Sequence, residues 1–157
     1  MQSRLLSLIA GVSYLIIFFA AIFANFFVLE AILANPLETI QQDHMMVRYG
    51  TLAFIITAVF DVVIAWALYE LYKQHPFSNL STYFRMMHAA IMATATFALP
   101  FAVASTTVAD ILHYTNVFNT IWLIGLFFFG IHLILLSNII GKPKFIALFL
   151  LIAGVMY

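Results

Sequence analysis

Three residues that can carry a charge or a proton, Asp61, His88 and His132, stand inside apolar stretches of the sequence. Asp61 lies near the middle of a long apolar run that begins at Arg48 and ends at Lys73. A carboxylate at membrane depth is costly, so it needs a partner, a bound proton or a water-lined cavity. Asp61 is therefore a candidate proton or cation site, or one half of a charge pair. The alternative is a structural carboxyl group, protonated or hydrogen-bonded to nearby hydroxyls, and the sequence leaves its charge open.

The two histidines fall on separate, antiparallel spans at similar depth. Counted from the expected inner boundary, Asp61 lies about 16 Å deep, His88 about 9 Å and His132 about 12 Å. Together they form a candidate intramembrane polar site, with Arg48 and Arg85 as secondary members. Arg85 is expected near the inner boundary, where its long side chain can reach the headgroups. Arg48 is about 20 Å from Asp61 along the same helix, so the expected partner of Asp61 is one of the two histidines.

Two histidines at one depth also suggest cofactor chemistry. They could ligate the iron of a haem b or flank a quinone, whereas the plainer alternative is hydrogen bonding between helices. Elsewhere Asp43 and His44 adjoin in a loop, but no set of ligands has the spacing of a tetrahedral zinc site. We therefore expect no metal and no cofactor, and keep haem as an alternative.

The elements that position these residues are apolar helices. Of the 157 residues, 66% are hydrophobic and 8% are charged, against about 45–50% and about 25% in soluble domains. This composition predicts an all-α, polytopic integral membrane helix bundle in a single membrane domain, residues 1–157. Four full transmembrane helices are expected at 5–33, 48–72, 81–108 and 120–140. A partial fifth at 145–157 covers about 20 Å of a roughly 30 Å core, as a half-span or as part of a longer chain.

Breaks between these spans follow from proline and polar residues. Asn35-Pro36 ends the first span and begins a short interfacial helix or capped loop. Pro100 lies inside the third span and predicts a kink. The stretch 110–119 reads as a brief polar connection before the fourth span.

Basic residues indicate the orientation. With the N-terminus in the cytoplasm, five basic residues lie inside and Arg48 lies outside, which fits the positive-inside rule. The five are Arg4, Lys73, Arg85, Lys142 and Lys144. The expected location is the cell inner membrane, with the lipid bilayer as the main partner.

Several function classes are excluded. The formal net charge is zero and no basic patch occurs, so nucleic acid is not an expected partner. Cysteine is absent, which excludes disulfides and thiolate chemistry. Phosphate-binding loops, nucleophile elbows and HExxH zinc motifs are missing too. We therefore expect no catalytic residues and no enzyme.

Short motifs along the chain resemble a known family. They are Arg48 and Asp61 with Leu68-Tyr69, Gly130-Ile131-His132-Leu133, Gly141-Lys142-Pro143, and the final stretch 151–157. Their order resembles the bacterial multi-span family catalogued as domain of unknown function 4386. The resemblance implies a longer chain of about six spans, of which this one stops within the penultimate span, and no known activity. It also draws attention to Arg48, Asp61 and His132 as matched polar positions.

Three function hypotheses remain. The first is an accessory, structural or assembly component that acts through helix–helix contacts, its fifth span completed by a membrane-protein partner or by a second copy in a homo-oligomer. The second is a proton-coupled or small-solute transport protein that uses Asp61 with His88 or His132. The third is a redox subunit that binds haem or quinone.

Overall fold

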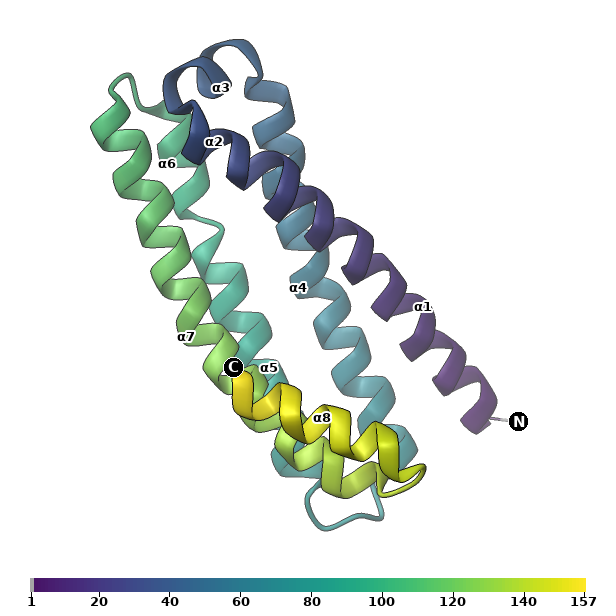
Figure 1. The fold of residues 1–157 in the computed structure, drawn as a ribbon. Helices are drawn as coiled ribbons and strands as arrows, with labels where there is room; N and C mark the ends of the chain where they lie inside the picture. Colours follow the sequence, from purple (N-terminus) through teal and green to yellow (C-terminus); the bar gives the residue numbers. More distant parts are fainter. Residues whose placement is uncertain (1) are drawn as a thin grey trace.

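A computed structural model describes residues 2–157, and helices make up nearly all of this part of the chain (Figure 1). They are α1 (Gln2–Ile22), η1 (Phe23–Leu29), α2 (Glu30–Ala34), α3 (Pro36–Gln42), α4 (His44–Tyr72), α5 (Ser78–Ala95), α6 (Ala98–Ala104), α7 (Val108–Ile140) and α8 (Lys144–Met156). Within these residues no strand is found. The predicted all-α fold is confirmed.

Four stretches are long and apolar enough to cross a membrane: Ser3–Ala34, His44–Tyr72, Ser78–Ala104 and Val108–Ile140. The chain is therefore a multi-pass membrane protein. The shorter α8 has 13 residues and is about 20 Å long. Figure 1 shows the start of α1, the α4–α5 turn and the α7–α8 turn at one end of the bundle, and α3 at the other.

Two of the predicted boundaries need correction. The stretch 110–119, expected to be a polar connection, belongs to the first turns of α7. Thr107 caps that helix, because its Oγ1 accepts a hydrogen bond from the Asp110 backbone N–H at 3.2 Å. α5 begins at Ser78, almost a turn earlier than expected, which places its polar residues deeper in the bundle.

The predicted kink in the third span is a break between α5 and α6. Pro100 has no N–H to donate to the Thr96 carbonyl, and the Leu99 N–H bonds that carbonyl instead at 3.2 Å. The Thr96 hydroxyl donates to the Ala93 carbonyl at 2.6 Å. The hydroxyl therefore helps to satisfy a carbonyl where the helix is interrupted.

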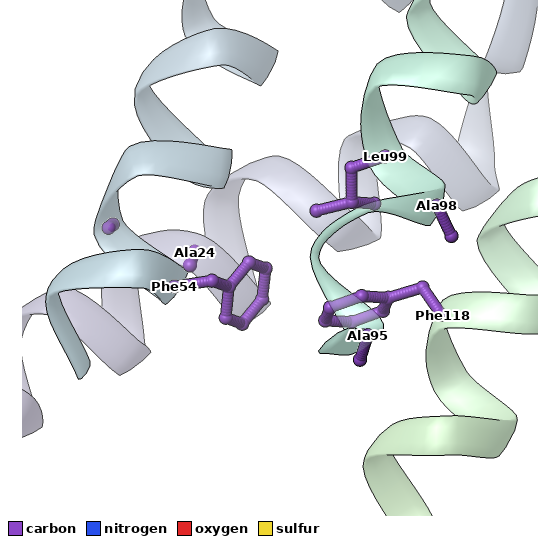
Figure 2. Close-up of a cluster of buried hydrophobic side chains, with 7 residues drawn as sticks. Ala24, Phe54, Ala95, Ala98, Leu99 and Phe118 are labelled. Atoms are coloured by element: carbon purple, nitrogen blue, oxygen red, sulfur yellow. The ribbon is translucent and has the colours of Figure 1, made fainter. Parts of the chain in front are cut away.

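An aromatic cluster fills the bundle beside this break. Phe54 from α4 and Phe118 from α7 face one another with ring centroids 4.8 Å apart, and small residues around them leave the room that the rings need (Figure 2). Trp122 lies 4.9 Å from the Phe54 ring. The cluster joins the long helices toward the α3 end of the bundle.

α8 turns back along α7 and packs against it at a pair of glycines. A Cβ atom at Gly130 would lie 2.7 Å from the Gly154 carbonyl oxygen, and a Cβ at Gly154 would lie equally close to the Gly130 carbonyl. The two backbones touch directly, as small residues allow in membrane helix pairs. The short helix thus has a packing partner within its own chain.

A substitution at Gly50 can test the packing between the first two spans. A Cβ there would lie 2.6 Å from Val28 Cγ1, and Val28 is stiff because it branches at Cβ. Gly50→Val should destabilise the protein by about 1–3 kcal/mol, measured by denaturation in mixed micelles, and Val28→Ala should recover part of the loss. Gly11→Val is the control, since a Cβ at Gly11 meets nothing within 4 Å. Equal stability of the two glycine variants would contradict this packing.

Candidate functional site

A buried polar stripe runs along one face of α5. Ser78, Ser81, Arg85 and His88 are spaced by three, four and three residues, and all four are buried. This spacing places them on one face of the helix. That face meets Asp61 on α4 and His132 on α7, which are also buried.

Arg85 pairs with Asp61 at the centre of the cluster. Its Nη2 donates to Asp61 Oδ1 at 2.5 Å, and the two side chains are 1% and 6% exposed. This corrects two predictions: Arg85 does not reach the headgroups, and the nearest partner of Asp61 is this arginine. Arg85 lies about 10 Å along α5 from Ser78, deep enough to neutralise an acid that would be costly alone.

The Arg85 guanidinium also connects the outer helices of the bundle. Its Nη1 donates to the Tyr14 hydroxyl on α1 at 2.8 Å and lies 3.2 Å from His132 Nε2 on α7. Its central carbon is 5.0 Å from the Tyr14 ring centroid and 5.3 Å from that of Phe129, within the range of cation–π attraction. One side chain therefore ties α1, α4 and α7 to α5.

The hydrogen bonds of His132 define its tautomer. Nδ1 lies 2.9 Å from the Ser81 carbonyl oxygen, which can only accept, so Nδ1 carries a proton. Nε2 faces the Arg85 guanidinium, which can only donate, so Nε2 carries a lone pair. His132 is therefore neutral, and a second proton on it would face the guanidinium charge.

His88 is different, because its second nitrogen faces an acid. Nδ1 lies 2.9 Å from the Gly125 carbonyl oxygen and must donate to it. Nε2 then lies 3.4 Å from Asp61 Oδ2. Without another proton, a nitrogen lone pair would face a carboxylate oxygen. This contact is therefore suited to hold one exchangeable proton, as an imidazolium on His88 or as a carboxylic acid on Asp61.

These contacts leave the histidines badly placed for iron. Each ring of His88 and His132 already has a protein partner at both nitrogens. A haem would have to break two of these contacts between buried side chains. In residues 2–157, no group of three or more His, Asp or Glu side chains is placed to hold a metal ion.

The structure gathers Asp61, His88 and His132, but not Arg48. Arg48 is exposed near the start of α4, so it takes no part in the buried cluster. Tyr14 also belongs to the cluster, although it was not predicted from the sequence. A tyrosine in the middle of an apolar span, and the even spacing of polar residues on α5, are the signals that could have revealed the full set.

Beside the cluster is a cleft of about 490 Å³ that is open on one side. Asp61, Arg85 and His88 line it at the bottom. Its walls are mainly apolar side chains of α1 and α7. Two of these wall residues, Leu15 and Phe18, are exposed at the surface of the bundle. In a membrane this surface faces lipid, so the cleft connects a charged floor with the hydrocarbon region.

The Nε of Arg85 is one buried donor for which residues 2–157 provide no hydrogen-bond partner. Over the same residues the Tyr14 hydroxyl accepts from Arg85, while no bond donated by that hydroxyl is found. Both side chains line the cleft. Two residues that line the cleft therefore have an unused donor, although the Arg85 Nε–H itself is buried, and the acid of the cleft is occupied by Arg85 and His88.

Comparison with known proteins identifies the family. Residues 9–157 match the family described as "Domain of unknown function (DUF4386)". The chain belongs to the DUF4386 family. The family predicted from the short motifs is thus confirmed over nearly the whole chain.

A relative of this DUF4386 protein is an "Uncharacterized protein" of Archaeoglobus fulgidus. The two are 30% identical over 115 residues, which cover 69% of this chain. The match spans 63% of the length of the archaeal protein. No solved structure matches the chain.

The DUF4386 protein should depend on Asp61 and Arg85 as a pair. Arg85→Met leaves a carboxyl group buried without its cation, so it should cost about 3–5 kcal/mol of stability. Adding Asp61→Asn should recover much of that loss, as a double-mutant cycle in mixed micelles would measure. Additive losses would contradict direct pairing. Lys73→Met is the control, because its pair with Glu70 is exposed and contributes little.

Proposed function

We propose that this DUF4386 protein is a proton-handling membrane transport protein in which Asp61 and His88 bind one exchangeable proton. The observation that carries the proposal is the contact of His88 Nε2 with Asp61 Oδ2 at 3.4 Å beside an open cleft. A buried ionisable group in a membrane span is expensive unless it is used or fully paired. Here the arginine neutralises the acid, and the histidine adds a proton-binding position.

The charged neighbours of His88 set the two states of the site. Asp61 faces it from α4, Arg85 lies one turn away on α5, His132 approaches Arg85 from α7, and Tyr14 reaches Arg85 from α1. With His132 neutral, the cluster has zero net charge without the extra proton and a charge of +1 with it. Proton binding thus changes the charge beside the cleft, which is what coupling to a solute requires.

Orientation and location complete the proposal. The end of the bundle that holds the start of α1 also holds the two turns that carry Lys73 and Lys142 (Figure 1). Lys144 begins α8 at that end. Without Arg85, four basic residues remain at that end (Arg4, Lys73, Lys142 and Lys144) and Arg48 lies at the other. By the positive-inside rule this distribution favours a cytoplasmic position for that end, in the cell inner membrane.

An accessory or assembly role is the second candidate. It is supported by the outer side chains of α8, such as Phe149 and Val155, which are exposed. A membrane-protein partner or a second copy of this chain could cover them, and so could lipid. The transport test separates the two roles, because an accessory subunit would carry no proton flux by itself.

Proton flux should depend on Asp61 and His88 and not on the imidazole ring of His132. In proteoliposomes made with the lipids that accompany the purified protein, a pH-sensitive dye should report proton movement driven by a potassium diffusion potential. Asp61→Asn and His88→Gln should abolish that movement, and His132→Gln should retain most of it, because an uncharged amide can replace the neutral ring. Unchanged flux in the first two variants would overturn the transport proposal.

Nitrogen-15 NMR on histidine-labelled protein can locate the proton directly. His132 should give the spectrum of a neutral ring protonated at Nδ1 over the whole accessible pH range. His88 should move between a singly and a doubly protonated ring. Spectra of His88→Gln and His132→Gln assign the signals, and a titrating His132 with a fixed His88 would contradict the proton assignment.

A further inference from the structure

The open cleft beside the cluster combines three properties of a ligand site. Its volume of about 490 Å³ lies within the usual range for small molecules. Its walls on α1 and α7 are apolar and reach the lipid-facing surface. Its floor carries the guanidinium of Arg85, which is 1% exposed. A ligand that fits must therefore have an apolar body and a polar head.

The floor selects the chemistry of that head. The unused groups are donors: Arg85 Nε–H lacks a partner among residues 2–157, and the Tyr14 hydroxyl has a proton to give. The acceptor at the floor, Asp61, is already bonded to Arg85 and faces His88. Buried donors without acceptors are costly, so a head that brings oxygen acceptors is favoured.

Charge narrows the choice further. When the proton of Asp61 and His88 is bound, the floor has a net charge of +1, which is expensive at membrane depth. An anion with a single charge would neutralise it, and an uncharged head would not. A carboxylate has one negative charge and two acceptor oxygens, and it forms charge-assisted hydrogen bonds with an arginine and a hydroxyl.

We propose that the cleft binds a long-chain carboxylate that reaches it sideways from the bilayer. The chain lies between α1 and α7, and the carboxylate accepts from the Tyr14 hydroxyl beside the Arg85 guanidinium. This inference rests on the proposed proton site, because the bound proton supplies the compensating charge. A protonated acid that arrives from the lipid brings both the proton and the carboxylate. Its O–H bond breaks, an N–H bond forms at His88 Nε2, and the carboxylate remains in the cleft, so the total charge does not change.

Trp122 makes the site measurable. The chain has two tryptophans: Trp122 lines the cleft, whereas Trp66 is exposed on α4 and does not line it. In a Trp66→Phe protein held in phosphatidylcholine nanodiscs, stearate brominated midway along its chain should quench Trp122 fluorescence with saturation. The matching brominated alcohol should quench at least tenfold more weakly. Quenching that never saturates, or equal quenching by the alcohol, would overturn the proposal.

Two variants separate ligand binding from folding. Tyr14→Phe removes one donor at a half-exposed position and should weaken stearate binding about tenfold, while Tyr83→Phe, exposed on α5 and outside the cleft, should not. Gly11→Leu places a side chain in open space at the cleft wall and should abolish saturable quenching, whereas Val12→Leu on the lipid side should preserve it. Full binding by Tyr14→Phe and Gly11→Leu would overturn the site.

The outcome is distinct from that of the transport test. Loss of flux in Asp61→Asn together with unsaturable quenching would keep the proton site and remove the carboxylate ligand. The proposal would also be overturned if quenching saturates but stearate binds no more tightly when His88 is protonated, because the compensating charge would then have no role. Stronger binding in the protonated state, lost in His88→Gln, would support it.

Discussion

The pairing of Arg85 with Asp61 is the constraint on which the rest of the bundle depends. An acid buried in α4 needs a cation, and the cation can reach it only if α5 begins early enough to carry Arg85 well below the helix end. Once buried, the guanidinium has donors left over, and Tyr14 and His132 accept from them. The position of four helices is therefore set by the hydrogen-bonding needs of one side chain. The Tyr14 and Phe129 rings beside it, and the Phe54 and Phe118 cluster farther along the bundle, fill the remaining space.

The cluster separates two histidines that look equivalent in the sequence. A carbonyl fixes the proton on Nδ1 in each ring, and the difference arises at the opposite nitrogen. His132 faces a cation and is held neutral, whereas His88 faces an acid, and the proposed proton site rests on that contact. The same residue type thus supplies a structural acceptor on α7 and, in the proposed function, a proton-binding position on α5. This division is why transport, rather than haem binding, is the function proposed.

The fold could be predicted from composition, and the site only in part. The length and hydrophobicity of the spans are local properties, so the all-α membrane bundle and its four long helices followed directly. Asp61, His88 and His132 were recognisable because polar residues at membrane depth are costly. Arg85 was misplaced because its depth depends on where α5 begins, and an arginine can also extend to the headgroups. Tyr14 stood out locally as a tyrosine in an apolar span, but its role was missed because its contact with Arg85 depends on how α1 packs in the bundle, which no local pattern gives. The region 110–119 was polar enough to read as a loop, yet the Thr107 cap and contacts with neighbouring helices make it helical.

The depth of His88 has an electrical consequence. His88 lies about 15 Å along α5 from Ser78, roughly half of a hydrocarbon core about 30 Å thick. With Ser78 at the membrane boundary, a proton that reaches the proposed site from water would cross about half of the membrane voltage, which corresponds to about 1.2 kcal/mol for every 100 mV. Its occupancy would then respond to the membrane potential as well as to pH. Moving an uncharged acid through the membrane potential requires no electrical work. Protonation of His88 would therefore depend on the voltage when the proton comes from water, and would not depend on it when the proton comes with an acid from the lipid.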